Sequence, residues 1–270
     1  MTFNKKYNQI KLPFDKYAFY SQAVQSPAED VKFYRRVYKE LRKGKLPSVL
    51  REDFSGTGAI CCEWVKLDKA HRSCGLDLDN EPMQYGRVNY ISKLKPEQQE
   101  RIAFINKDVL TKGLPKADVV VAVNFSYFFF KKREILKSYF ENVYKSLNAD
   151  GIFVVDIFGG TQCTDAIEDK TVHKNFTYYW DQKNFDPLTN EAYFEIHFKT
   201  KGKKYEGVFT YDWRMWSIQE IREIMAEVGF QKTQVYWEGT DSKGSGNGIF
   251  KVVEKGESCL SWIAYIAGAK

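Results

Sequence analysis

The 270-residue chain contains no apolar run that approaches the ~20 residues needed to cross a bilayer. Its start, MTFNKKYNQI, has no apolar segment behind its charges, which argues against a secretory signal. The five cysteines include no CxxC pair, so a disulfide framework and a zinc site are both poorly supported. These absences predict a cytosolic (cytoplasmic) protein with reduced thiols, no membrane contact and no metal.

The segment VLREDFSGTGA, residues 49–59, lacks one glycine of the dinucleotide-binding fingerprint. Gly56 and Gly58 fit a loop that exposes backbone N–H groups between a strand and a helix, but Cys61 occupies the third glycine position. Two glycines alone are equally typical of an ordinary turn. The missing third glycine disfavours a pyrophosphate-bound dinucleotide such as NAD.

Positive charge is concentrated near the N-terminus. Residues 1–50 hold eleven Lys and Arg against four Asp and Glu, whereas the whole chain has a formal net charge of +6. Such a segment can meet nucleic acid or an acidic partner, and it is also what a solvated helix face looks like. Val31, Tyr34 and Val37 form an apolar stripe at helical spacing, so we favour the helix and keep nucleic acid as a minor hypothesis.

Alternating strand and helix signals predict an α/β fold with a doubly wound parallel sheet. Strands are expected at 49–54, 73–78, 102–106, 118–124 and 152–158, and helices from Pro27 to before Gly44 and near 58–67, 82–92 and 131–147. The later residues predict an antiparallel flap with strands at 178–182, 192–199 and 207–213. They also predict a helix between Ser217 and Gly229, and strands at 234–238 and 261–266 around a glycine-rich loop, 239–248.

These elements suggest four parts of the chain. We expect an N-terminal helical cap over residues 1–47 and a cofactor-binding α/β core over 48–160. The antiparallel flap, 161–213, is expected to bind the acceptor, and residues 214–270 to complete the core.

Acidic residues follow two neighbouring strands of the predicted sheet. Asp77 lies 19 residues beyond Gly58 and can accept hydrogen bonds from both ribose hydroxyls of a nucleoside. Asp108 follows the third strand and can accept from an exocyclic amine such as adenine N6. Each acid alone is also typical of a strand-end cap. Their arrangement at successive strand ends, beside the glycine loop, favours a nucleoside site.

The motifs FSGTG, GLDLD, KDVL, VAVNFSYF and LNADGIFVVDIF, in this order, resemble the class I S-adenosylmethionine-dependent methyltransferases. The resemblance runs from Val49 to Phe158 and extends through DWRMWSIQEIREIMAEVGF. It implies a seven-stranded Rossmann-like sheet whose last strand is antiparallel, with S-adenosylmethionine bound across the strand tips. In the family's first motif Glu52 takes the acid's position, while Phe54 replaces the first glycine. That ring must either line the cofactor pocket or turn into the core.

The resemblance also implies which residues form the site. The expected cofactor-binding residues are Tyr20, Glu52, Phe54, Gly56, Gly58, Asp77, Leu78, Asp108, Val109 and Asn124. Asn124 and Tyr127 are the expected catalytic residues, because Asn124-Phe125-Ser126-Tyr127 partly resembles the [Asn/Asp/Ser]-Pro-Pro-aromatic motif of amine methyltransferases. Both prolines are missing, and a buried asparagine with core aromatic residues is the alternative interpretation.

The acceptor is expected between the N-terminal segment and the flap. The expected substrate-binding residues are Tyr17, Trp180, Arg214 and Trp216. Arg214 can clamp an anionic acceptor or simply stack on a neighbouring tryptophan. The three histidines, His71, His173 and His197, form no base-like arrangement, and we name no general base.

These observations predict methyl transfer from S-adenosylmethionine to a small-molecule acceptor by in-line displacement. The alternatives are an RNA or protein methyltransferase, or a protein that binds S-adenosylmethionine without turnover. Neither the acceptor nor the oligomeric state follows from the sequence.

Overall fold

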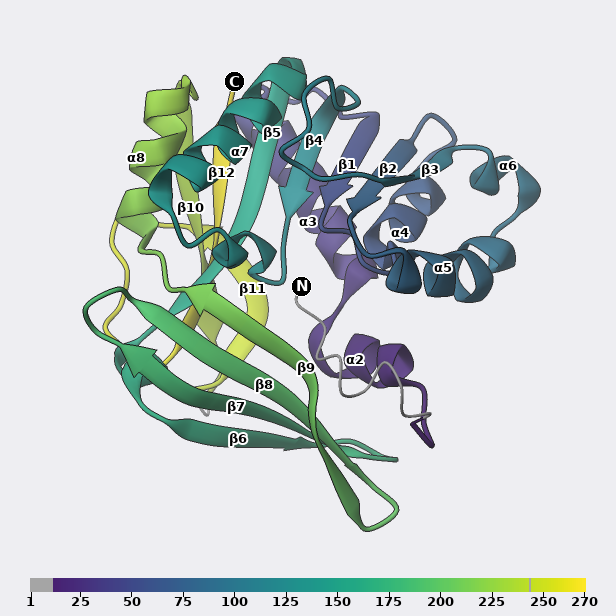
Figure 1. Ribbon diagram of the computed structural model, residues 1–270. Helices are drawn as coiled ribbons and strands as arrows, with labels where there is room; N and C mark the ends of the chain where they lie inside the picture. Colours follow the sequence, from purple (N-terminus) through teal and green to yellow (C-terminus); the bar gives the residue numbers. More distant parts are fainter. Residues whose placement is uncertain (1–11, 243) are drawn as a thin grey trace. The chain divides into compact units, whose positions relative to one another are not determined.

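A computed structural model describes residues 12–242 and 244–270 (Figure 1). The described residues form two compact units. The α/β unit contains residues 27–127, 132–161 and 217–270, and the antiparallel unit contains 12–26, 128–131 and 162–216. The cap expected over 1–47 is therefore divided between the units after Ser26. The segment MTFNKKYNQI, for which a secretory signal was not expected, lies outside the described residues.

The α/β unit is built on an eight-stranded sheet with the order β11–β10–β12–β5–β4–β1–β2–β3. Strands β5, β4, β1, β2 and β3 are parallel, whereas β12 is antiparallel to both β5 and β10. Their bounds are β1 (Val49–Asp53), β2 (Arg72–Asp77), β3 (Ile102–Asn106), β4 (Ala117–Ala122), β5 (Leu147–Gly159), β10 (Lys232–Thr240), β11 (Gly246–Val252) and β12 (Trp262–Ala269). The predicted doubly wound sheet is confirmed, and β11 extends its edge by an eighth strand.

Helices cover both faces of this sheet. The helices are α3 (Pro27–Leu41), α4 (Ala59–Leu67), α5 (Asn80–Asn89), α6 (Pro96–Gln99), α7 (Arg133–Ser146) and α8 (Ile218–Val228), with short 3₁₀ turns η1 (Ile91–Lys93), η2 (Ser126–Phe129) and η3 (Thr161–Thr164). Ile152 and Val154 of β5 join a core with α3 and α4, while Phe153 packs on Phe140 of α7 and on Phe230. Burial on both faces explains why the parallel strands read as continuous apolar runs.

Helix α8 shows how local sequence sets an element's limits. Ser217 Oγ accepts from the Glu220 amide, and the Glu220 carboxylate accepts from the Ser217 amide, which together form a capping box. Gly229 ends the helix at φ 116°, a left-handed conformation that glycine adopts without strain. The predicted limits of this helix, Ser217 and Gly229, are confirmed.

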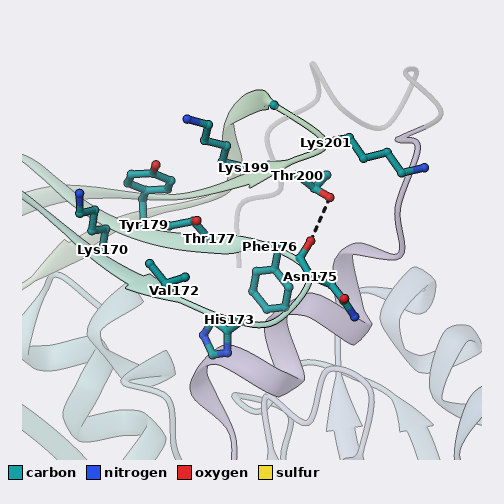
Figure 2. Close-up of a pocket in the computed structure, with 11 residues that line it drawn as sticks. Lys170, Val172, His173, Asn175, Phe176, Thr177, Tyr179, Lys199, Thr200 and Lys201 are labelled. Atoms are coloured by element: carbon teal, nitrogen blue, oxygen red, sulfur yellow. Dashed lines mark hydrogen bonds between the residues drawn. The ribbon is translucent and has the colours of Figure 1, made fainter.

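The antiparallel unit contains one sheet with the order β6–β7–β8–β9. Its strands are β6 (Ile167–Val172), β7 (Thr177–Asp186), β8 (Glu191–Thr200) and β9 (Lys203–Arg214). The ends of its two hairpins meet, because Thr200 Oγ1 donates to the Asn175 carbonyl at 3.2 Å (Figure 2). The predicted flap is confirmed as an antiparallel sheet, and β6 is a strand that the sequence analysis missed.

The two faces of this sheet differ sharply in chemistry. Side chains alternate along a strand, so Phe194 and Phe198 of β8 lie on an aromatic face, whereas Glu195 and His197 lie on a polar one. Helix α2 (Lys16–Val24) packs on the aromatic face.

Helix α2 was also not predicted as a helix. Asp15 caps it by accepting from the Tyr17 and Ala18 amides, and Phe19 stacks on Phe176 with ring centroids 4.1 Å apart. Its packing on the sheet, rather than a helical apolar stripe, accounts for its position.

The predicted loop 239–248 is wrong as a single loop. Strand β10 continues to Thr240 and β11 begins at Gly246, so most of this segment is a hairpin. Gly248 donates its amide to Glu238 across the hairpin, at 2.9 Å. Strand β11 was not predicted because its beginning is rich in glycine. Backbone pairing with β10, rather than side-chain packing, keeps it at the edge of the sheet.

Candidate functional site

The loop between β1 and α4 has an unusual backbone. Phe54, Gly56 and Gly58 all have positive φ, at 58°, 53° and 67°. The Ser55 amide donates to the Leu76 carbonyl of β2, and the Gly58 amide donates to the Ser55 carbonyl. The loop is thus a tight turn attached to the neighbouring strand, as the glycine pair predicted.

Two glycines allow the loop to pack closely on its surroundings. A Cβ at Gly58 would lie 2.0 Å from the Phe104 ring of β3, and a Cβ at Gly86 of α5 would lie 2.0 Å from the Thr57 carbonyl oxygen. At Gly56, by contrast, an added Cβ would meet nothing within 4 Å. The loop is therefore closely packed below Gly58 and open at Gly56, where a ligand can approach the backbone.

Asp77 connects this loop to the tip of β2. Its carboxylate accepts from the Gly56 amide at 2.7 Å and from the Asp79 amide at 2.8 Å. Burial raises the pKa of Asp77, and these two backbone hydrogen bonds oppose that rise. Asp79, the next acid, caps α5 through the Glu81 amide. Asp77 is therefore the carboxylate that contacts the glycine loop, whereas Asp79 caps a helix.

The residues predicted beyond the strand tips lie where expected along the sheet edge. Leu78 follows Asp77 and is 67% exposed, an unusual position for a leucine. Asp108 follows β3 and accepts from the Leu110 amide, whereas Val109 is buried. The carboxyl ends of parallel strands meet at one edge, so these residues border the same side of the sheet as the glycine loop.

Glu52 lies beneath the loop and is buried. Its carboxylate accepts from the Cys61 amide in the first turn of α4, at 3.2 Å. Burial raises the pKa of Glu52 to about 8, although the bond from Cys61 opposes the rise. The group is thus largely protonated at neutral pH and supports the helix start from below.

Phe54 turns toward helix α7. Its ring meets the Tyr139 ring edge-on, with centroids 5.6 Å apart, and it is only partly buried. Of the two possibilities that the sequence left open, this contact supports a ring directed toward the core helix.

A buried ion pair, which was not predicted from the sequence, lies on the opposite face of β1 from Glu52. The guanidinium of Arg51 donates to both Asp53 carboxylate oxygens, at 2.8 and 3.1 Å, and both side chains have no solvent exposure. Tyr139 and Ser146 of α7 complete the network, since the Tyr139 hydroxyl donates to Asp53 and Arg51 donates to Ser146. This network joins the strand below the loop to the helix that Phe54 contacts.

The end of β4 carries a second strained turn. Asn124 and Phe125 both have φ near 56°, a conformation that is unfavourable for phenylalanine. Asp156 of β5 holds it by accepting from both backbone amides, at 2.7 and 2.9 Å. Burial raises the pKa of Asp156 to about 7, against the lowering by these two bonds. Asn124 is thus positioned at the strand tip by a buried carboxyl group.

Tyr127 is less exposed to solvent than Asn124. Its side chain has no solvent exposure, and its ring lies 6.2 Å from the Phe140 ring of α7. The structure therefore places Tyr127 in the core, as the alternative interpretation of this motif expected, while Asn124 remains partly exposed at the strand tip.

The predicted substrate-binding residues all lie in the antiparallel unit. Tyr17 of α2 contacts Phe209 of β9, as does Tyr20, the residue expected at the cofactor. Trp180 of β7 stacks on Phe194 with ring centroids 5.0 Å apart. These side chains belong to the aromatic face of the sheet and its covering helix.

Arg214 and Trp216 form a stacked pair at the end of β9. The guanidinium carbon lies 3.8 Å from the Trp216 ring centroid, and Arg214 donates to the Lys131 carbonyl. The cation–π arrangement, one of the two alternatives for Arg214, is thus what the structure contains. Trp216 is buried, and its indole N–H has no partner among the described residues.

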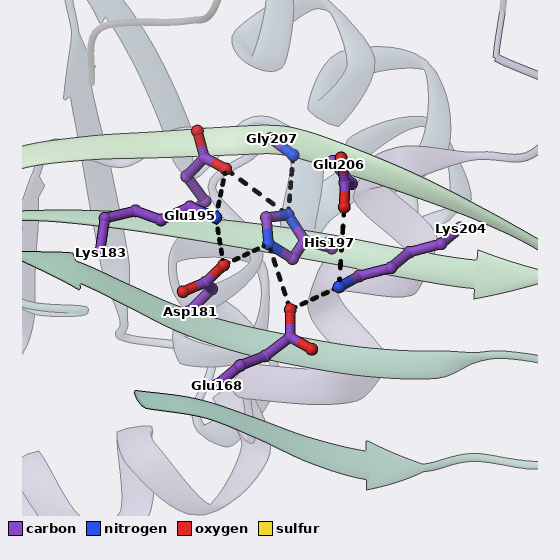
Figure 3. A network of polar contacts seen from close by, with 8 residues as sticks. All are labelled: Glu168, Asp181, Lys183, Glu195, His197, Lys204, Glu206 and Gly207. Carbon is purple, nitrogen blue, oxygen red and sulfur yellow. Dashed lines mark hydrogen bonds and ion pairs between the residues drawn. The ribbon is translucent and has the colours of Figure 1, made fainter. Parts of the chain in front are cut away.

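His197 lies in a charged network on the polar face of the antiparallel sheet (Figure 3). Its Nε2 lies 2.9 Å from Asp181 and 3.6 Å from Glu168, a set of three potential metal ligands. Its Nδ1 accepts from the Gly207 amide, so the neutral ring carries its proton on Nε2 and donates to Asp181. A metal-bound Nε2 requires the opposite tautomer. The geometry therefore favours a structural network over a metal site.

Five free cysteines agree with the expected reduced thiols, and three of them are buried. Among the described residues, no helix combines the length and apolar character needed to cross a membrane.

Comparisons with known proteins reveal one related sequence and many similar structures. No protein-family model matches the chain. Over 214 residues the chain is 22% identical to YqeM of Bacillus subtilis (strain 168), which is named as a proposed methyltransferase; the match covers 76% of this chain and 83% of that protein.

Two solved structures are similar over nearly their whole lengths. An S-adenosylmethionine-dependent methyltransferase from Clostridium acetobutylicum ATCC 824 has a TM-score of 0.65 at 17% identity, covering 94% of this chain and 97% of that one. The S-adenosylmethionine-bound CalS10, an amino pentose methyltransferase from Micromonospora echinaspora involved in calicheamicin biosynthesis, has a TM-score of 0.66 at 14% identity, covering 97% and 100%. At these identities, the likeness shows a shared fold.

Proposed function

We propose that this chain, whose fold is that of the class I S-adenosylmethionine-dependent methyltransferases, transfers a methyl group from S-adenosylmethionine to a small-molecule acceptor. The observation that carries the proposal is the bond from the Gly56 amide to the Asp77 carboxylate. It joins a glycine turn, open to a ligand, to an acid suited to a ribose diol. The related sequence named as a proposed methyltransferase supports the same reaction.

The residues at the strand tips fit this cofactor. Gly56 leaves space beside the backbone, and Ser55 contributes a buried hydroxyl without a hydrogen-bond partner among the described residues. We assign the ribose to Asp77 and the adenine to the apolar Leu78 and the acid Asp108. The bound cofactor would supply a methyl group on a positive sulfur for in-line transfer.

The turn after β4 is proposed to form the wall of the reaction site. Asp156 holds the Asn124 backbone in its left-handed conformation, so the Asn124 side chain starts from a fixed position. We assign Asn124 a role in orienting the acceptor. Tyr127, buried against α7, acts as a positioning residue that supports this turn from the core.

The acceptor is proposed to be a small molecule that contacts aromatic side chains of the antiparallel unit. Tyr17, Trp180, Arg214 and Trp216 supply ring faces and a cation, which suit a compact polar molecule. The amino pentose described for CalS10 supports an acceptor of this size. The cytoplasm remains the proposed location.

Calorimetry with S-adenosylmethionine and with NAD tests the proposal. We expect S-adenosylmethionine to bind and NAD not to bind. Asp77→Asn should weaken binding roughly 10- to 150-fold, because charge-assisted hydrogen bonds contribute ~1.5–3 kcal/mol each. Asp79→Asn is the matched control, since Asp79 caps α5 and should leave the affinity nearly unchanged.

Two outcomes would contradict the proposal. Binding of NAD without S-adenosylmethionine would reject the cofactor. Binding of S-adenosylmethionine without methyl transfer to any component of a metabolite extract, but with transfer to RNA or protein, would replace the small-molecule acceptor with a macromolecular one.

A further inference from the structure

Positive charge is segregated at one end of the antiparallel sheet. Residues 170–180 and 196–205 together contain six lysines and no acidic residue. The two segments lie at the meeting hairpin ends, where Lys170 is paired with Tyr179 across β6 and β7, and Thr177 with Lys199 across β7 and β8. Lysines distant in the sequence are thus brought to one place.

A hollow of about 370 Å³ lies among these lysines (Figure 2). Its volume falls within the ~300–1,000 Å³ typical of small-molecule pockets. It is lined by cationic and neutral polar side chains with two aromatic rings, and no carboxylate borders it. The lining includes Lys170, His173, Tyr179, Lys199 and Lys201.

The lysines that line the hollow differ from those farther along the same face. Lys183 and Lys204 form ion pairs with Asp181 and Glu168. No ion pair within the described residues uses the ammonium groups of Lys170, Lys199 or Lys201. The cations beside the His197 network are therefore neutralised, whereas the three lysines that line the hollow have no counter-charge among the described residues.

His173 borders the hollow from the aromatic side of the sheet, where its ring and that of Phe176 point away from Lys170 and Lys199 (Figure 2). Its ring stacks on Phe176 with centroids 4.5 Å apart, which fixes the ring's orientation. Its Nε2 is buried and has no hydrogen-bond partner among the described residues. A phosphate group is instead a suitable partner for the ammonium groups on the other face, because its oxygens are negatively charged and accept hydrogen bonds.

We propose that this hollow binds a phosphoryl group of a small phosphorylated molecule. Several ammonium groups around a concave site suit a compact anion with several oxygens. A hollow confined to the ends of two hairpins favours a small ligand over a nucleic acid, which requires a longer basic surface along its backbone. The site lies wholly within the antiparallel unit and does not depend on the proposed methyl transfer.

Inorganic pyrophosphate is the probe for a direct test by calorimetry on the full chain. We expect saturable binding that weakens as salt rises, since exposed charges are screened. The triple variant K170Q/K199Q/K201Q should weaken it by at least roughly tenfold, because three cation–anion contacts are lost. All three side chains are exposed, so the variant should fold normally.

The matched control is K39Q/K93Q/K112Q, which removes three exposed lysines of the α/β unit and changes the net charge equally. It should bind pyrophosphate like the unaltered chain. Equal weakening in both triple variants, no binding at all, or binding of single-stranded RNA without pyrophosphate would each overturn the proposal. Binding of S-adenosylmethionine, measured on the same variants, should be unchanged and reports separately on the proposed function.

Discussion

The two units place their polar groups in different ways. In the α/β unit, polar groups collect at strand ends, where Phe54, Asn124 and Phe125 are held in left-handed conformations by packing and by buried acids. In the antiparallel unit, the non-glycine residues with positive φ lie in the hairpin turns, at Asn190 and Lys201, and the polar groups lie along one face of the strands. The first arrangement gathers polar groups at strained turns, and the second gathers them as side chains along the strands.

The difference has an energetic meaning. Strained conformations persist only where surrounding structure holds them. We therefore expect substitutions beneath the loop of the α/β unit to lower the free energy of unfolding more than comparable changes in the antiparallel unit.

Asp53→Ala should cause the largest loss, because it leaves the Arg51 guanidinium buried without its partner. We expect the free energy of unfolding to fall by ~3–5 kcal/mol in urea titrations. Asp150→Ala, which breaks the exposed ion pair with Lys45, should leave the free energy of unfolding nearly unchanged. Asp181→Ala, on the polar face of the antiparallel sheet, should fall between them at about 1–3 kcal/mol. A loss at Asp181 that equals the loss at Asp53 would contradict the comparison.

Gly58→Ala compares with Gly202→Ala, since both glycines have positive φ but only Gly58 is packed against a side chain. The left-handed conformation alone should cost about 1–2 kcal/mol at Gly202. The overlap with Phe104 should add roughly 1–3 kcal/mol at Gly58. Thermal unfolding of both variants measures the difference, and equal costs would show that Phe104 moves away freely.

Glu52→Gln should change how stability depends on pH. The folded chain keeps the Glu52 proton up to a pKa of about 8, whereas the unfolded chain releases it near 4.5. Unfolding therefore releases a proton in this window, and the unaltered chain loses stability as the pH rises through it. As the pH rises from 4.5 to 9, the free energy of unfolding of the variant should come to exceed that of the unaltered chain by ~1–4 kcal/mol. Parallel pH profiles in urea unfolding would reject this assignment.

Arg214→Met should cause the smallest loss in the free energy of unfolding. The guanidinium lies over the buried Trp216 ring, and such contacts contribute about 0.5–1 kcal/mol at partly exposed sites. Lys203→Met, which removes a more distant and exposed cation from the Tyr205 ring, is the control and should cost less. A larger loss at Lys203 would show that ring stacking does not explain the position of Arg214.

Much of the α/β unit could be predicted, because its strands are apolar runs between clear helix signals. The strand 102–106 has the predicted limits. The acids at the ends of β2 and β3 lie at one edge of the sheet, as expected for residues that follow parallel strands. Strand β6, IEDKTV, was missed because most of its side chains are exposed and polar. Helix α2 was missed because its aromatic residues form no one-sided stripe.

The less predictable part of the site depends on contacts between distant residues. Nothing near Asn124 in the sequence indicates that Asp156 accepts from its amide. The pairing of Arg51 with Asp53 requires knowing that both point to the face covered by α7, whereas Glu52 points to the other. The positive φ of Phe54 and Phe125 could not be predicted from the sequence either, because phenylalanine disfavours this conformation.

The pairing of β12 with β5 has a consequence for how the chain folds. Ile152 is paired with Ala269, so the sheet is completed only when the C-terminal strand arrives, after the whole antiparallel unit has been made. Hairpins between neighbouring strands have short loops to close and can form first. Loop-closure entropy grows only slowly with length, by ~0.6 kcal/mol per doubling, so inserting a preformed unit between β5 and β12 adds little to the cost of closing the sheet. The order of strands thus lets the antiparallel unit vary in length while the α/β sheet keeps its topology.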